Sequence, residues 1–270
     1  MKYDFIKPKI EPKHFILGQG NVPFNIINPE RDWSNDLPKD EIQQIKGLET
    51  YNCTAFNTLK QIQMYEKFAF HQDNNYSERW LGIIAGTEPP GNDPHIVYEA
   101  IRKYGLIPDS MLPFSDDITT IEDYYSFKGG NKDACYEAGI KWLETKNFFH
   151  EWVFDPNVNL STEQKKDALK TALYSSPICL AVYAWIQNDK GIYIKLGEEN
   201  HWTCMSKFDE YQNIIDSYNP THKLADQDII YAKRIYIQIK SATKIKDNKI
   251  LGNSLCEFIR NILNKIITKK

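Results

Sequence analysis

The hydrophobic positions in the first half of the chain follow a helical rhythm. Directly after Cys53, apolar side chains recur at the spacing of one helix face and predict a helix to about residue 69. Asp93, Pro94 and Gly105 are a typical N-cap, first-turn proline and stop signal for another helix. Further helices are expected over residues 77–86 and 131–146. The first half is therefore predicted to be mostly helical.

The second half changes to short runs rich in β-branched and aromatic residues. A helix is expected over residues 161–176, where a serine is followed three residues later by glutamine. The runs that follow it are typical of an antiparallel sheet or half-barrel: "ICLAVYAW", "GIYIKL", "HWTCMSKF", "NIIDSY" and "RIYIQIK". We expect an α+β fold with two lobes, a helical lobe over about residues 41–160 and a β lobe over about 161–240. A ligand cleft is expected between such units.

The two ends of the chain differ from this central domain of residues 41–240. Residues 1–40 are rich in proline, asparagine and charge, and predict an irregular arm with one or two short strands. Residues 241–270 carry seven Lys or Arg, two Asp or Glu and an apolar stripe at helical spacing. This pattern predicts a basic amphipathic helix that packs on protein. Association with a membrane surface is the less favoured alternative.

Composition excludes several classes of protein. The net charge is −3 over 270 residues, which gives no general case for binding nucleic acid. No apolar run approaches the roughly 18 residues of a membrane span, and the N-terminus lacks the apolar region of a secretory signal. Five widely spaced cysteines without a CxxC pair fit a reducing compartment rather than a disulfide framework. We therefore expect a cytoplasmic protein.

Cys53 is the residue that best fits a chemical role. It lies where an extended polar run gives way to the predicted helix, and the free N–H groups of a helix N-terminus favour a thiolate and a developing oxyanion. An inert buried thiol is the alternative for such a cysteine. The chain contains no P-loop, GxGxxG, HExxH or paired zinc-ligand motif. We expect neither a cofactor nor a metal ion.

A candidate base and a candidate orienting residue follow Cys53 along the chain. Among six histidines, His201 opens the strand "HWTCMSKF", 148 residues after Cys53. Asp216 belongs to the next run, "NIIDSYNP", which is expected to pair antiparallel with the first and to bring its carboxylate to the imidazole. Asn219 is a weaker candidate. Papain-type enzymes place the histidine about 130–150 residues after the cysteine, so the spacing favours a nucleophilic role for Cys53.

These motifs resemble those of the papain-like cysteine peptidases, in particular the divergent type encoded by tailed phages. The resemblance covers roughly residues 40–220 and rests on five segments: "ETYNCTAFN", "SERWLGIIAGT", "GNDPHIVYEAIRKYGLIP", "SSPICLAVYAW" and "NHWTCMSKFDEYQNIIDSYNP". It implies that Cys53 is the nucleophile, His201 the base and Asp216 the third member. The family's oxyanion glutamine precedes the cysteine by about six residues, but that position is Gly47 here. Gln44 is the first choice for this role and Gln43 the alternative.

The resemblance implies a hydrolase that cleaves amide bonds of a peptide or protein through a thioester intermediate, with processing of a virion or host protein as its biological setting. Two alternatives stay open. One is a cell-wall amidase or endopeptidase of the NlpC or CHAP type, although those domains are smaller and have a much shorter Cys–His separation. The other is a papain fold without catalysis, kept as a structural or binding component of a phage particle.

Overall fold

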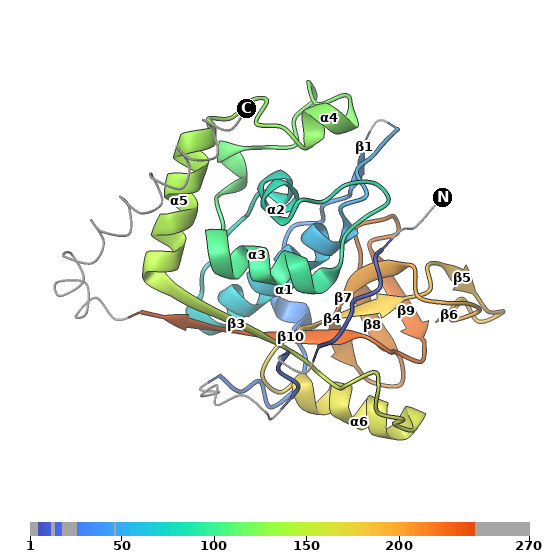
Figure 1. The fold of residues 1–270 in the computed structure, drawn as a ribbon. Coiled ribbons are helices and arrows are strands. Elements are labelled where there is room, and N and C mark those ends of the chain that lie inside the picture. Colours follow the sequence, from blue (N-terminus) through green and yellow to red (C-terminus); the bar gives the residue numbers. More distant parts are fainter. Residues whose placement is uncertain (1–4, 12–13, 18–25, 46, 241–270) are drawn as a thin grey trace.

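The computed structural model describes residues 5–11, 14–17, 26–45 and 47–240, and the C-terminal helix expected over 241–270 lies outside them. The elements are drawn in Figure 1 and are, in chain order, η1 (Ser34–Asp36), β1 (Gln44–Ile45), β2 (Leu48–Glu49), α1 (Cys53–Phe70), α2 (Glu78–Ala85), α3 (Pro94–Tyr104), η2 (Asp109–Met111), α4 (Ile121–Tyr124), α5 (Lys132–Thr145), β3 (Lys146–Trp152), α6 (Thr162–Ala172), β4 (Ile178–Val182), β5 (Ile186–Gln187), β6 (Tyr193–Ile194), β7 (His201–Phe208), β8 (Gln212–Ile215), β9 (His222–Asp226) and β10 (Ala232–Ile239).

The larger of the two sheets found in the described residues has the strand order β3-β10-β4-β7-β8-β9-β6-β5. Its neighbouring strands are antiparallel except for β6 and β9, which pair in parallel. The predicted α+β class is confirmed, as is the antiparallel pairing of the strands that carry "HWTCMSKF" and "NIIDSY". Strands β3 and β9 were not predicted. β3 lies between two helices and β9 is short and polar.

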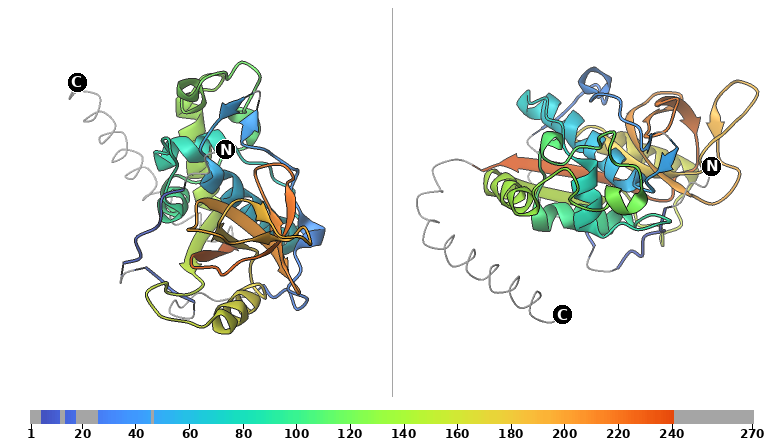
Figure 2. Two further views of the ribbon diagram at one scale, coloured as in Figure 1. Left: turned by 90° about the vertical axis from the view of Figure 1, so that its right-hand side faces the viewer. Right: turned by 90° about the horizontal axis from the view of Figure 1, so that it is seen from above.

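The helices are divided unequally between the two sides of the long strands. Figure 1 shows α1 to α5 on one side of β3 and β10, with α6 on the other, and the left view in Figure 2 agrees with this separation. The short strands β5 and β6 extend away from the helices at the far end of the sheet. The contact between helices and sheet is made mainly by α1 against β7, and by α3 and α5 against β3.

Helix α1 passes through the core of the molecule. Every residue from Cys53 to Glu66 is buried, including Lys60 and Gln61. Because a helix buried on all sides has no polar face, its buried polar groups must find partners inside the protein. The Gln61 amide donates to the carbonyls of Pro177 and Lys233, at 2.7 and 2.9 Å. These bonds fix α1 against β10, which contains Lys233, and against the start of β4, which follows Pro177.

Side-chain caps hold the N-termini of the other α-helices. The predicted cap of α3 is confirmed, with Asp93 accepting from the His95 N–H and Pro94 in the first turn. The capping box of α6 is also confirmed, between Ser161 and Gln164. Helix α1 differs, because the side chain of its N-cap residue, Asn52, makes no hydrogen bond to the first turn.

Candidate active site

Cys53 is the first residue of α1, at a helix N-terminus whose cap side chain is used elsewhere. The Asn52 amide donates to the carbonyl of Glu78 and to the hydroxyl of Tyr124, both at 2.9 Å. In the first turn of α1, the Ala55 N–H donates to the Asn52 carbonyl at 3.0 Å, and the N-cap side chain bonds none of the first-turn N–H groups. Such a terminus stabilises a negative charge on the sulfur or on an atom bound to it.

His201 is the first residue of β7 and lies between Cys53 and Asp216. Its Nε2 is 2.6 Å from Oδ1 of Asp216, and its ring also interacts with Cys53, which raises the pKa of the imidazole. His201 and Cys53 are each 1% exposed and Asp216 is fully buried. The structure therefore brings together the three site residues that were predicted from the sequence, although they come from distant parts of the chain.

Asp216 is held by donors on both oxygens. Besides His201, Oδ1 accepts the backbone N–H of Ser217 at 2.8 Å. Oδ2 accepts the indole N–H of Trp185 and the ammonium of Lys223, both at 2.8 Å. With both oxygens bonded, the carboxylate cannot rotate freely, and its Oδ1 stays directed at the imidazole.

The charges of these groups shift their pKa values in opposite directions. Burial lowers the pKa of His201, but the charges of Asp216 and Cys53 outweigh it and raise the pKa to about 9. Burial raises the pKa of Asp216, but the cations of His201 and Lys223 hold that pKa well below its usual range. At neutral pH the imidazole is therefore protonated and faces a carboxylate on one side and the sulfur on the other.

Asn57, one helical turn after Cys53, fixes the cysteine against the histidine strand. Its amide donates to the carbonyl of Trp202 at 2.8 Å and contacts Ser217 Oγ at 3.1 Å. One turn further, the Lys60 ammonium donates to the backbone carbonyl of Asp216. Helix α1 thus supplies both the thiol and the contacts that hold its partners in position.

Gln43, rather than Gln44, reaches this network. Its backbone N–H donates to the Ser217 carbonyl at 3.0 Å, and its side-chain carbonyl accepts from Ser217 Oγ at 2.7 Å. Its amide nitrogen donates to Glu49 at 2.9 Å and to the Tyr218 hydroxyl at 2.7 Å. None of the side-chain hydrogen bonds found in the described part of the chain involves Gln44, because alternation along an extended segment turns adjacent side chains apart. Of the two candidates for the oxyanion glutamine, the one that lies in this network is therefore Gln43, the alternative given in the sequence analysis.

Sequence reasoning missed Lys223, Trp185 and Asn57 as members of the site. Lys223 belongs to β9, whose alternation is inverted, since the lysine is 4% exposed while the neighbouring Leu224 is 45% exposed. Hydropathy therefore places the lysine outside and the leucine inside. Trp185 ends an apolar run, so its pattern predicts a core residue. Asn57 lies in a helix whose first fourteen residues are buried, where a polar side chain gives no sign of its partners. No local pattern would have identified them.

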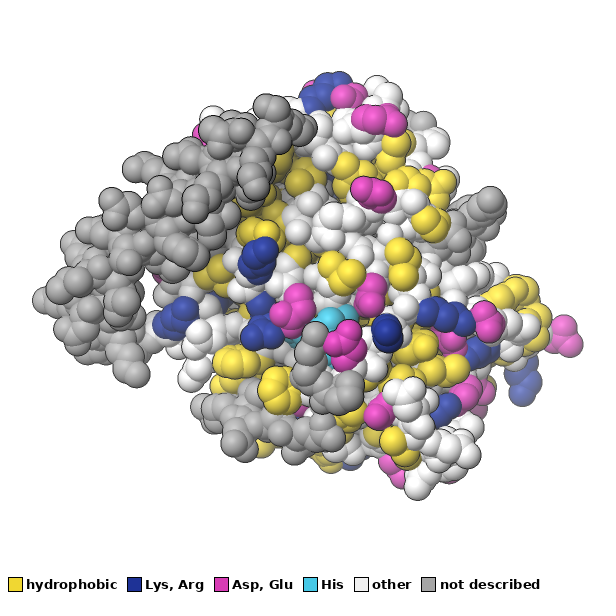
Figure 3. Space-filling model, viewed as in Figure 1, with side chains coloured by type: hydrophobic (Ala, Val, Ile, Leu, Met, Phe, Trp, Pro, Cys, Tyr) yellow, Lys and Arg dark blue, Asp and Glu magenta, His cyan; other side chains and the backbone are white. Residues whose placement is uncertain are grey.

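A second cluster of titratable groups lies on another part of the molecule. His95 and His150 both approach the Lys233 ammonium, at 3.2 and 2.9 Å, and His150 also pairs with Glu99 at 2.8 Å. The rings of His14 and His95 lie against each other, with their centroids 3.7 Å apart and their planes tilted by 31°. Figure 3 shows histidine side chains near the middle of one face, among acidic and basic side chains. His95 is half-buried, and burial and the charge of Lys233 lower its pKa to about 3.

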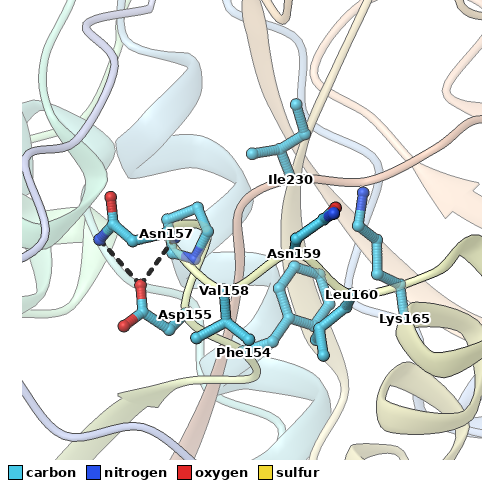
Figure 4. A pocket seen from close by; sticks show the side chains of 9 residues that line it. Phe154, Asp155, Asn157, Val158, Asn159, Leu160, Lys165 and Ile230 are labelled. Atoms are coloured by element: carbon cyan, nitrogen blue, oxygen red, sulfur yellow. Dashed lines mark hydrogen bonds between the residues drawn. The ribbon is translucent and has the colours of Figure 1, made fainter.

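A pocket of about 210 Å³ lies between β3 and α6, lined by the connecting loop, Lys165 and Ile230 (Figure 4). Asp155 in this loop accepts from the backbone and side chain of Asn157, both at 2.8 Å. The lining contains neither cysteine nor histidine, so the pocket has no counterpart of the Cys53 site.

The part of the chain that the structure describes holds no group of three or more His, Cys, Asp or Glu arranged for a metal ion. None of its helices is long and apolar enough to cross a lipid bilayer.

Solved structures of cysteine proteases share this fold. Xylellain, a cysteine protease from Xylella fastidiosa, superposes with a TM-score of 0.58 at 14% identity, covering 89% of this chain and 96% of its own. A recombinant stem bromelain precursor gives 0.52 at 13% identity, covering 84% and 76%. Bromelain from Ananas comosus in complex with the inhibitor E64 gives 0.50 at 14%, covering 77% and 98%. The chain therefore has a papain-like fold. No protein-family model and no curated protein sequence matches it.

Proposed function

We propose that the chain is a cysteine peptidase in which Cys53 is the nucleophile, His201 the general acid and base, and Asp216 the residue that orients the imidazole. The observation that carries this proposal is the buried His201–Asp216 pair, 2.6 Å apart and joined on its other side to a cysteine at an uncapped helix N-terminus. The papain-like fold supports it, because its solved neighbours are cysteine proteases.

The reaction follows from the placement of these groups. The Cys53 thiolate attacks the carbonyl carbon of the scissile amide, and the charge that develops on its oxygen faces the N–H groups of the first turn of α1. Protonated His201 gives its proton to the leaving amine, which leaves a thioester on the sulfur. The imidazole then takes a proton from water, and the hydroxide formed hydrolyses the thioester and restores the thiolate–imidazolium pair. Asp216 keeps Nε2 engaged throughout, so that the other ring nitrogen serves the reaction.

The substrate class that we propose is a peptide or protein, and the setting is a reducing compartment, where the four cysteines in the described residues stay unpaired. Processing of a virion or host protein is the biological role that accords with the sequence resemblance to tailed-phage proteins. The test of the chemistry is the reactivity of the Cys53 thiol at mildly acidic pH and its dependence on His201.

The oxyanion glutamine is tested by a matched pair of variants. We expect Gln43→Ala to lower kcat by about 100-fold, the typical cost of one oxyanion donor, with KM little changed. Gln44→Ala is expected to stay within about twofold of wild type. Since both amide hydrogens of Gln43 are donated to Glu49 and Tyr218, one of them must be released when substrate binds. Steady-state hydrolysis of a labelled peptide checks both variants. A loss confined to Gln44→Ala would restore the first choice of the sequence analysis.

The segment around Phe5 is expected to limit access to the site. Phe5 is 9% exposed and stacks on Trp202, the residue after His201, with ring centroids 6.3 Å apart. The next two residues fasten the segment on both sides: the Ile6 N–H donates to the Asn92 carbonyl at 3.3 Å, and Lys7 pairs with Glu198 at 2.8 Å. Because Cys53 and His201 are almost fully buried, a peptide can reach them only after a covering segment moves.

Replacing Phe5 by alanine is therefore expected to raise kcat/KM by about fivefold. Loss of an aromatic pair weakens docking of the segment by about 1 kcal/mol, which increases the uncovered fraction by that factor. Phe15→Ala is the matched control, because Phe15 is 58% exposed. The rates of both variants are compared with wild type on the same peptide. An unchanged or lower kcat/KM for Phe5→Ala would show that the segment does not restrict substrate.

A further inference from the structure

Lys223 is a buried cation next to the proposed catalytic residues. Its side chain is 1% exposed, and its three ammonium hydrogens meet three acceptors: Oδ2 of Asp216 at 2.8 Å, the Tyr218 carbonyl at 2.7 Å, and the Pro220 carbonyl. The ammonium also lies 5.0 Å from the centre of the Trp185 ring. Burying a lysine is costly unless it is paired, so this arrangement has a specific partner, Asp216.

Asp216 consequently faces two cations, one on each oxygen. Oδ1 is bonded to His201 and Oδ2 to Lys223, and all three side chains are shielded from solvent. Without a second cation beside it, the carboxylate would stabilise the imidazolium with its full negative charge. The imidazolium would then be a weaker acid toward the leaving amine, and catalysis is most efficient when the acid's pKa lies near the working pH.

We propose that Lys223 is a positioning residue that offsets part of the charge of Asp216, so that the carboxylate orients His201 while exerting less than its full charge on the imidazolium. This inference rests on the proposed function of Cys53 and His201. It assigns to β9 a part in tuning the base, and it explains why a lysine occupies an inward position of a strand whose leucine points outward.

Other ionisable groups around His201 bear on the same balance, and they stay unchanged in the comparisons below. Those that face the His201–Asp216 pair from the packed elements are Cys53 and Lys60 of α1, Glu49 of β2 through its hydrogen bond to Tyr218, Tyr193 of β6, and Tyr218 after β8.

The test is a set of three variants whose His201 titrations are compared with wild type. Lys223→Met removes the cation at similar length and is expected to move the titration of His201 upward by about one pH unit. Asp216→Asn removes the anion and is expected to move it downward. The double variant Asp216→Asn with Lys223→Met removes both charges, and its titration is expected to lie about one pH unit above that of Asp216→Asn and below that of wild type. The alkaline limb of kcat/KM is expected to shift in the same directions.

The titration is followed by NMR of the imidazole resonances, with His201 assigned by their loss in His201→Gln. This readout does not need turnover, so a chain that cleaves nothing still reports the charge balance, and the two proposals fail separately. Lys190→Met, at an exposed position, is the control for loss of a lysine. An unshifted His201 titration in folded Lys223→Met overturns the inference. If Lys223→Met does not fold, the double variant is compared with Asp216→Asn, and a titration no higher than that of Asp216→Asn overturns it.

Discussion

Replacing Cys53 by alanine is expected to abolish peptide hydrolysis, with kcat/KM lowered by about 10⁴-fold or more. The thiol is the only atom of this residue that can form the thioester, and no other cysteine in the described residues lies beside His201. Without it, only binding and the helix N-terminus remain to assist water. Fluorescein-labelled casein is a suitable first substrate, because its cleavage reports any peptidase of broad specificity.

Cys135→Ala provides the matched control for loss of a buried thiol. Cys135 belongs to a separate apolar cluster with Trp80, Ile107 and Leu112, so its loss is expected to leave the rate within about twofold of wild type. Equal rates for wild type and Cys53→Ala would exclude the proposed nucleophile. Absence of cleavage by wild type, on casein and on labelled peptides, would favour the non-catalytic alternative, in which the papain fold serves as a structural or binding component.

The second large effect is expected from His201→Ala, with kcat lowered by about 10³ to 10⁴-fold. The variant loses both the proton donor for the leaving amine and the cation that stabilises the thiolate. In wild type, kcat/KM is expected to fall as pH rises through about 9, because the His201 imidazolium is lost there. In His201→Ala that alkaline limb is expected to disappear.

The same pair links stability to pH, and the sign follows from the raised pKa of His201. The stabilisation is complete below the ordinary histidine pKa of about 6.5, and it is lost as pH rises through about 9. His201→Ala lacks this dependence, so chemical denaturation of wild type and variant is expected to converge toward alkaline pH. His222→Ala is the control, since that histidine is exposed. If His222→Ala lost the pH dependence of stability to the same extent as His201→Ala, the assignment would be contradicted.

The parts of the fold that depend on local sequence signals could be predicted. The helix after Cys53, the capped helix at Asp93 and the capping box at Ser161 each rest on a few adjacent residues, and the structure has all three. The antiparallel pair that carries His201 also follows from two runs rich in β-branched and aromatic residues that a short turn separates. Strand β3 escaped prediction, because its pairing with β10 joins residues more than 80 positions apart and leaves little local trace.

The candidate site divides in the same way. Cys53, His201 and Asp216 were identified from residue type, order and spacing, and the structure places them in contact, while their roles remain proposals. Lys223 has no such signal, since only the tertiary structure shows that a lysine in a short polar strand points inward at a carboxylate. Gln43 and its neighbour could not be separated by sequence, because which of two adjacent side chains faces the site depends on how the segment is paired.

The reactivity of the Cys53 thiol as a function of pH tests the central claim most directly. The measurement is the rate of alkylation by iodoacetamide, followed by mass spectrometry of the peptide that contains Cys53, in wild type and in His201→Ala. If a thiolate–imidazolium pair exists, wild-type Cys53 is alkylated readily at pH 6, and His201→Ala loses this reactivity until the pH approaches about 8.5, the range of an ordinary cysteine. Identical profiles for the two proteins, both rising only near pH 8.5, would contradict the account.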